Sequence, residues 1–227
     1  MSKILIEINK LSKNFKNNNS IIKVLKNVNL KLEKGKLVAL VGPSGSGKST
    51  FLHLIALLDK PTKGDIILLG NKTQNISEDK KNLIIRKNIS IIFQNNNLLS
   101  DFTALENVAI PLIIRGNSYN SSIKKAAEIL SIVNLTNRVS HFPSDMSGGE
   151  QQRVAIARSL ASDTSIILAD EPTGNLDEKT SEEVFSYLLK LKKKNKTILI
   201  ATHNRELAKK ADYTLRLTDG NIKRFNV

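Results

Sequence analysis

The fold is decided by residues 36–58, KLVALVGPSGSGKSTFLHLIALL. A short apolar run opens this stretch, and such runs are typical of strands buried on both faces of a parallel sheet. A glycine-rich turn follows the run, and the residues from Lys48 onward indicate a helix. The order of strand, turn and helix predicts one unit of an α/β fold.

The turn itself, GPSGSGKST at residues 42–50, fits the pattern G-x-x-x-x-G-K-[ST]. Its three glycines let the backbone curl and point its N–H groups at phosphate. Lys48 can reach the β- and γ-phosphates, Ser49 can offer its hydroxyl to Mg²⁺, and Thr50 adds a donor near the α- and β-phosphates. We predict a nucleotide-binding loop made of Gly42, Pro43, Ser44, Gly45, Ser46, Gly47, Lys48, Ser49 and Thr50.

Two acids end a later apolar run, IILADE at residues 166–171. Asp170 is placed to hold Mg²⁺, and Glu171 is placed to orient or deprotonate an attacking water. A kinase transfers phosphate to a hydroxyl and has less need of the second acid. The pair therefore favours hydrolysis of ATP by water.

Two polar residues follow further apolar runs, Gln94 after ISIIF and His203 after TILIAT. The carboxyl ends of parallel strands share one edge of the sheet, so we expect both near Asp170. His203 is predicted to contact the γ-phosphate, and Gln94 to bind Mg²⁺ or the attacking water. His53, within an apolar helix, and His141, in a loop, are expected to be structural.

A helical region interrupts this α/β pattern between residues 95 and 162. Thr103 and Glu106 have the spacing of a capping box, and Pro111 is expected to end or kink the helix that they start. Residues 121–133 carry apolar side chains at helical spacing. Nearer the N-terminus, the sequence predicts strands at 4–8 and 27–32 on either side of a polar loop, KNNNS.

The stretch MSGGE, residues 146–150, precedes another helical segment. Ser147 and the two glycines after it leave backbone N–H groups uncovered at a helix start, which suits an anion. An ordinary N-cap needs only a serine or an aspartate. The sequence therefore predicts a second phosphate-binding feature about a hundred residues after the first.

Taken together, these motifs resemble those of ABC-type ATPases over essentially the whole chain. The shared motifs are the Walker A loop at 42–50, Gln94, the signature at 146–150, the Walker B strand at 166–171, the D-loop GNLD at 174–177 with Asp177, and His203.

The resemblance implies a P-loop NTPase (RecA-like) core with an N-terminal antiparallel β subdomain and an inserted α-helical subdomain. It divides one ABC ATPase domain, 1–227, into a core of 1–94 with 163–227 and an insertion of 95–162.

The same resemblance assigns further roles. In this family two domains pair head to tail, so Ser147, Gly148, Gly149 and Glu150 would contact ATP held by the other copy. Phe15, in LSKNF, stands where the family places an aromatic that stacks on adenine. The implied ligands are ATP and Mg²⁺, with Ser49, Gln94 and Asp170 around the metal.

Sequences around these motifs indicate one subgroup of the ABC-type ATPases. The stretches FQNNNLLSDFTALENVAIPLII and LADEPTGNLD are similar to lipoprotein-releasing (Lol-type) ATPases. Macrolide-exporter-type and cell-division (FtsE-type) ATPases belong to the same group and remain alternatives. The resemblance implies a homodimer on the cytoplasmic face of the inner membrane, with residues 95–115 contacting an integral membrane permease.

Composition limits the other classes of function. The 227 residues have a net charge of +14, which could suit nucleic acid, but the lysines are spread along the chain and aromatics make up only 4%. We expect no specific nucleic-acid partner. No apolar run reaches the roughly eighteen residues of a membrane span, and MSKILIEINK lacks a signal peptide's apolar core, so we expect a cytoplasmic protein.

Overall fold

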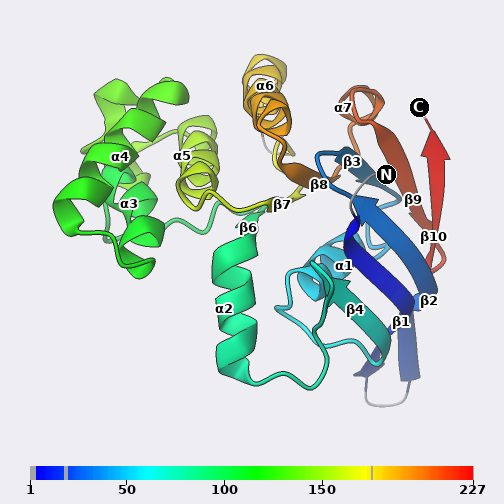
Figure 1. The fold of residues 1–227 in the computed structure, drawn as a ribbon. Coiled ribbons are helices and arrows are strands. Elements are labelled where there is room, and N and C mark those ends of the chain that lie inside the picture. Colours follow the sequence, from blue (N-terminus) through cyan, green and yellow to red (C-terminus); the bar gives the residue numbers. More distant parts are fainter. Residues whose placement is uncertain (1–3, 18–19, 175, 227) are drawn as a thin grey trace.

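The computed structural model describes residues 4–17, 20–174 and 176–226 as two sheets with helices between and beside them (Figure 1). The strands are β1 (Ile4–Asn17), β2 (Ser20–Glu33), β3 (Leu37–Val41), β4 (Lys63–Leu68), β5 (Asn71–Lys72), β6 (Ile89–Ile92), β7 (Ile166–Asp170), β8 (Thr197–Ala201), β9 (Tyr213–Thr218) and β10 (Asn221–Asn226). The helices are α1 (Lys48–Ile55), α2 (Glu78–Asn88), α3 (Ala104–Ile114), α4 (Tyr119–Ile132), α5 (Gly148–Ala161), α6 (Glu178–Lys193) and α7 (Arg205–Lys209), with short 3-10 turns η1 (Thr136–Arg138) and η2 (Pro143–Asp145).

The larger sheet has the strand order β10-β9-β3-β8-β7-β6, and only β10 runs antiparallel to its neighbour. Its central strands are buried on both faces because alternate side chains enter two different cores. Leu168 and Leu199 pack with α1, whereas Ile167 and Ile198 pack with the helices on the opposite face. This explains why the strands are continuous apolar runs in the sequence.

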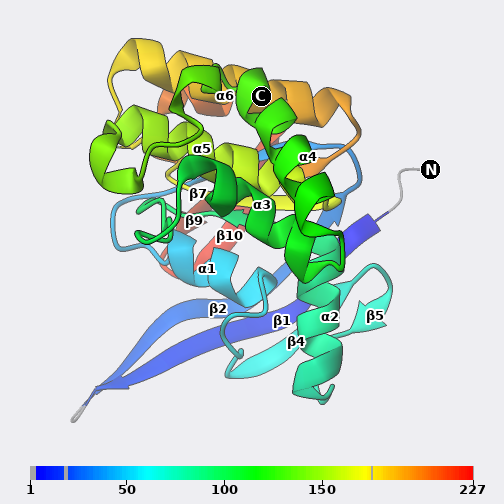
Figure 2. The same cartoon turned by 90° about the vertical axis from the view of Figure 1, so that its left-hand side faces the viewer.

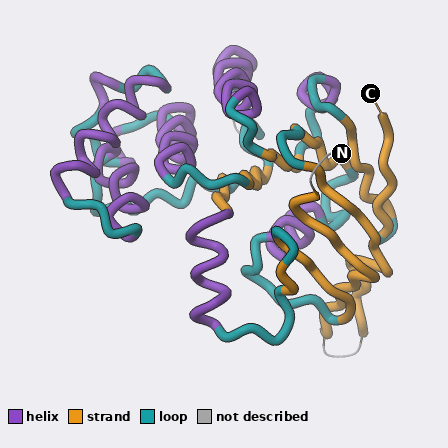
Figure 3. Tube along the Cα trace, in the orientation of Figure 1, coloured by secondary structure: helices purple, strands orange, loops and turns teal. Residues whose placement is uncertain are grey.

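The smaller sheet is antiparallel, in the order β2-β1-β4-β5. Helix α1 lies between the two sheets, and strands gather on one side of the molecule while most helices gather on the other (Figures 1 and 3). The predicted fold class is thereby confirmed: an α/β core, an antiparallel β part and a helical part.

The hairpin of β1 and β2 is longer than predicted. Strands were expected at 4–8 and 27–32, with a polar loop at 16–20, but the two strands pair out to Asn17 and Ser20. Figure 2 shows this hairpin extending away from the rest of the chain. The backbones of β1 and β2 stay paired beyond the last residues of the apolar pattern. The pattern therefore predicted only the buried half of the hairpin.

The helices α3, α4 and α5 fall within the predicted insertion. Thr103 and Glu106 form the predicted capping box at the start of α3. Pro111 does not end that helix, which continues to Ile114. The sequence pattern did not predict α2, a polar helix with no buried residue.

None of the helices in the described part of the chain is both long and apolar enough to cross a lipid bilayer.

Candidate nucleotide site

The start of α1 has no side-chain cap. Gly47 stands at the N-cap position with a φ of 101°, which is left-handed backbone that residues with a Cβ rarely adopt. A Cβ there would also lie 2.4 Å from Cγ1 of Val24. Since no side chain caps this helix, the backbone amides of its first turn stay available to a phosphate.

Lys48, the first residue of α1, is buried and points back over the loop. Its Nζ donates hydrogen bonds to the carbonyl oxygens of Gly42 at 3.1 Å and Pro43 at 3.3 Å. The same Nζ lies 3.7 Å from Oε1 of Glu171. The lysine charge is therefore held over the mouth of the loop, beside the second acid of the Walker B strand.

The structure brings nine of the predicted residues around one cavity of about 520 Å³. Those lining it are Ser44, Gly45, Gly47, Lys48, Ser49, Thr50, Gln94, Glu171 and His203. They come from the ends of three strands and from the start of α1, as expected for the carboxyl edge of a parallel sheet. The other predicted residues do not line this cavity: Phe15, Gly42, Pro43, Ser46, Asp170, Asp177 and the signature.

Glu171 sits at the centre of these contacts. Its Oε2 lies 3.0 Å from Nδ1 of His203 and accepts a 3.2 Å hydrogen bond from the His203 backbone N–H. Its own φ is 45°, an uncommon backbone conformation that is often found at functional sites. Its backbone N–H donates to the carbonyl of Ala201 on β8, which fixes this turn against the neighbouring strand.

Asp170 is suited to a cation. It ends β7, is 7% exposed, and its Oδ1 is buried without a hydrogen-bond partner. In the described residues, no group of three or more His, Cys, Asp or Glu side chains converges to hold a metal ion without other ligands. A single carboxylate, the Ser49 hydroxyl and the Gln94 amide oxygen are hard ligands of the kind Mg²⁺ takes together with substrate phosphates, so these residues fit a Mg²⁺–nucleotide complex.

The signature forms the start of α5. Ser147 is the N-cap, and its side chain accepts from the Glu150 backbone while the Glu150 carboxylate accepts from the Ser147 backbone. The two glycines differ: a Cβ on Gly148 would meet open space, but one on Gly149 would lie 2.8 Å from Cγ2 of Thr180. Gly149 is therefore required for packing against α6, and Gly148 presents an open backbone.

The carboxylate of Glu150 is fully engaged within its own chain. Oε2 accepts from the Ser147 backbone at 2.8 Å, and Oε1 accepts from Nε of Arg138 at 2.7 Å. The Ser147 hydrogen bond, followed by the Arg138 contact, lowers the pKa of Glu150 to about 2. Its side chain thus supports the helix start.

A second cavity of about 370 Å³ reaches from the Walker B end to the signature helix. Gln94 and Glu171 line both cavities, and Gly148 lines only the second. Arg158, missed in the sequence, donates to the carbonyls of Asn96 at 2.9 Å and Asn97 at 2.8 Å and so ties the segment after Gln94 to α5. No short-range pattern would have indicated this contact, which spans more than sixty positions.

Phe15 and Asp177 both lie away from the cavity at the nucleotide-binding loop. Phe15 on β1 is 42% exposed, with Nζ of the buried Lys13 4.8 Å from its ring centroid. Asp177 caps α6 by accepting from the Thr180 backbone at 3.0 Å. Asn175, part of the predicted D-loop, lies outside the described residues.

Comparisons with known proteins agree with these motifs. The model of the family described as ABC transporter matches residues 25–174. The chain belongs to the ABC transporter family. It is an ATP-binding and ATP-hydrolysing transporter subunit.

Individual relatives of this ABC ATPase cover 87–98% of its length. The lipoprotein-releasing system ATP-binding protein LolD of Rickettsia bellii (strain RML369-C) is 47% identical over 224 residues, covering 98% of this chain and 99% of that protein. An uncharacterized ABC transporter ATP-binding protein of Methanocaldococcus jannaschii is 47% identical over 198 residues, covering 87% and 88%. The dimeric structure of the ATP-binding cassette MJ0796 in a post-hydrolysis state, bound to ADP and Pi, matches with a TM-score of 0.93 and 40% identity over 98% of both chains.

Proposed function

We propose that this ABC ATPase powers the release of lipoproteins from the inner membrane. The observation that carries the proposal is the full-length similarity, at 47% identity, to a protein described as the ATP-binding subunit of a lipoprotein-releasing system. In such a system, the ATPase would bind at the cytoplasmic face of the membrane, beneath integral membrane subunits that select the cargo.

The site geometry supports the following chemistry. ATP lies with its phosphates over the Gly47 turn and its γ-phosphate near Lys48. Glu171 orients the attacking water and accepts its proton, while His203 holds the Glu171 carboxylate in place from 3.0 Å and donates towards the γ-phosphate. Mg²⁺, held by Ser49, Gln94 and Asp170, would neutralise charge on the phosphate oxygens when bound.

Phe15 completes the nucleotide site in this proposal by stacking on the adenine. The ammonium of Lys13 lies near its ring and forms a 2.7 Å ion pair with Asp59. Phe15 is 42% exposed, which leaves ring surface on which a base can stack.

The catalytic unit in this proposal is a homodimer. Ser147 and Glu150 do not line the cavity at the P-loop of their own chain, and Gly148 opens to a different cavity. A helix start that does not line the P-loop cavity of its own chain supports a role towards ATP bound by a second copy, with Asp177 near the shared interface.

The coupling surface is proposed to be residues 95–115. Four of its apolar side chains are exposed, namely Leu99, Phe102, Ile113 and Ile114. Exposed apolar side chains grouped in one segment are typical of a protein–protein contact. A helix of the permease would pack here, and Gln94 would pass its movement to the nucleotide.

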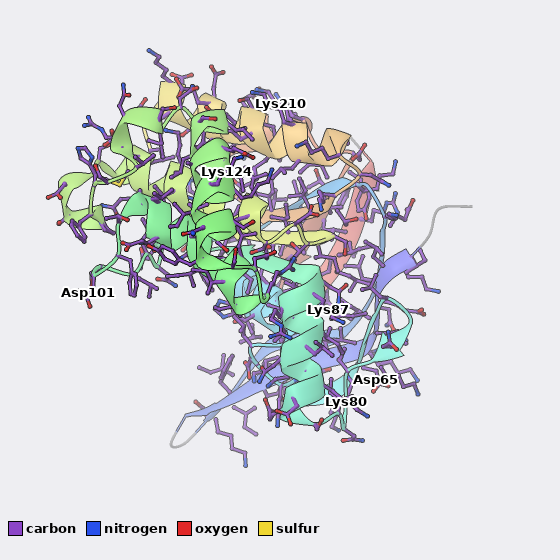
Figure 4. The ribbon with its side chains drawn as sticks, turned by 60° about the vertical axis from the view of Figure 1, so that its left-hand side comes forward. Asp65, Lys80, Lys87, Asp101, Lys124 and Lys210 are labelled. Carbon is purple, nitrogen blue, oxygen red and sulfur yellow. The ribbon has the colours of Figure 1, made fainter. Side chains whose placement is uncertain are left out.

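The +14 charge does not require a nucleic-acid partner. Figure 4 shows Lys87, Lys124 and Lys210 on separate elements of the fold, as expected for dispersed surface charge. Tight, salt-resistant binding of DNA or RNA without nucleotide would contradict this interpretation.

The first experiment tests the catalytic base with Glu171→Gln. We expect ATP binding to persist while the turnover rate falls by roughly 10²–10⁴-fold, the usual contribution of a general base. A variant at the exposed Glu128, Glu128→Gln, is the matched control and should keep full activity. Undiminished turnover in the Glu171 variant would exclude it as the base.

The second experiment tests the transport role. Co-purification in mild detergent identifies the membrane subunits, and the complex is then placed in proteoliposomes with an acylated lipoprotein. Release of the lipoprotein to a soluble acceptor, dependent on ATP, is the expected result. Drug efflux instead would favour the macrolide-exporter alternative, and a complex that binds ATP but moves neither cargo would favour the cell-division alternative.

A further inference from the structure

The signature carries a negative charge, Glu150, in the helix turn that is proposed to bind phosphate. Glu150 lies three residues after Ser147, in the first turn of the helix that is proposed to meet the partner's ATP. Its pKa of about 2 keeps it ionised at neutral pH. A carboxylate there suits the positive end of α5, but it also repels an approaching phosphate.

The backbone of the signature leaves only part of its donors free. The Ser147 N–H is taken by Glu150 Oε2, and the Glu150 N–H points to Ser147 Oγ at 3.3 Å. The amides of Gly148 and Gly149 are the first two of α5, and such amides have no acceptor within the helix. The phosphate-binding capacity of this helix start therefore rests on two amides that lie next to the Glu150 charge.

Arg138 is the cation that pairs with the Glu150 carboxylate. It ends η1, and its Nε donates to Glu150 Oε1 at 2.7 Å. Its Nη1 lies 3.2 Å from Nε2 of His141, so the guanidinium is held from two sides. The Glu150 side chain is 17% exposed and the Arg138 side chain is 45% exposed, so the carboxylate is sheltered while the guanidinium stays open to solvent.

The segment after Arg138 is also anchored. The carbonyl of His141 accepts from the Ala104 backbone at 2.8 Å, and the carbonyl of Val139 accepts from the Leu105 backbone at 3.0 Å. These are the first two amides of α3, which would otherwise lack acceptors. Arg138 thus reaches Glu150 from a segment that is fixed to a neighbouring helix.

We propose that Arg138 is a positioning residue for the signature: it holds the Glu150 carboxylate against the Ser147 backbone and offsets its charge. The partner's nucleotide then meets the amides of Gly148 and Gly149 without an uncompensated carboxylate beside them. This inference deepens the proposed function and rests on its head-to-tail dimer.

The test uses the full chain with Glu171→Gln, which keeps ATP bound, as the parent. Arg138→Met is added alone and together with Glu150→Gln, because a glutamine can still complete the capping box without carrying charge. Lys125→Met is the matched control, since Lys125 forms a 3.0 Å surface ion pair with Glu128 on α4. ATP-dependent dimerisation is followed by sedimentation, and ATP binding to the monomer by a fluorescent ATP analogue.

Arg138→Met should raise the ATP concentration for half-maximal dimerisation about tenfold, because two signatures close in each dimer. Monomer ATP affinity should not change, and Lys125→Met should behave like the parent. Adding Glu150→Gln should bring dimerisation back to within about threefold of the parent, since the charge to be offset is gone.

Two results would overturn the inference: unimpaired dimerisation in Arg138→Met, or a double variant as impaired as Arg138→Met alone. The second would mean that Arg138 acts only through packing, which thermal unfolding of the same variants would reveal as a loss of stability. A parent that binds ATP but never dimerises would instead overturn the head-to-tail arrangement itself.

Discussion

The chain contains two helix starts suited to phosphate, and they are built differently. At α1 the N-cap is Gly47, no side chain caps the helix, and Lys48 supplies a charge at the same place. At α5 the N-cap is Ser147, a complete capping box is present, and Arg138 contacts the acid of that box rather than the open amides. The first start combines uncapped backbone amides with a charged side chain, whereas in the second the capping box and the nearby arginine are engaged with each other.

The largest expected effect comes from removing the charge of the first site. Lys48→Met should weaken ATP binding to the monomer about a hundredfold, the scale of a lost charge-assisted hydrogen bond with its ion-pair contribution. Dimerisation should be lost with it. Titration with a fluorescent ATP analogue measures this, and Lys60→Met, at an exposed position, should bind like the unmodified chain.

The second-largest expected effect distinguishes the role of the α5 start from that of the α1 start. Ser147→Arg places a bulky side chain at the opening of α5, so we expect ATP-driven dimers to disappear while monomer ATP affinity is unchanged. Gel filtration with ATP in the Glu171→Gln background gives the readout. Dimers that persist would show that α5 does not face the second nucleotide.

A smaller effect distinguishes the two signature glycines. Gly149→Ala should lower the free energy of unfolding by about 1–2 kcal/mol, because its Cβ would crowd Thr180. Gly148→Ala, with open space around its Cβ, should leave stability within about 0.5 kcal/mol. Urea unfolding measures both, and adding Thr180→Ser should recover most of the loss in Gly149→Ala.

The smallest effect concerns the acid of the capping box. The pKa of Glu150 is lowered from 4.5 to about 2 by its hydrogen bond from Ser147 and its contact with Arg138. The stability that its ionised form contributes is therefore present above about pH 4.5 and is lost as the pH falls towards 2. Glu150→Gln should be less stable than the unmodified chain at pH 7, and the difference should shrink below pH 4.5 in urea unfolding.

Much of this site could be predicted because its signals are local. The P-loop is a contiguous motif, and the apolar runs before Asp170 and His203 indicated strands whose ends share one edge. The rule that parallel strands end at one edge placed His203 at the same edge as Asp170, and the structure has the neighbouring Glu171 3.0 Å from His203.

The missed features depend on contacts that no local pattern encodes. The distal half of the β1–β2 hairpin is held by backbone pairing. Helix α2 has no buried residue, and its partly buried Ile84 and Ile85 are adjacent in sequence and give no helical period. Pro111 was expected to end or kink its helix, and α3 instead continues past it to Ile114. Arg138 meets Glu150 only because η1 turns the chain back towards α5.

The order of strands in the large sheet also has a consequence for synthesis on the ribosome. The strand that leads into the P-loop, β3, lies between β8 and β9, and both come from the end of the chain. With about 150 residues between β3 and β8, at roughly 5–20 residues per second, an apolar strand waits on the order of ten seconds for its neighbours. The contacts among α3, α4 and α5 form within one contiguous stretch, so the helical part can be complete while the nucleotide-binding strand is still unpaired.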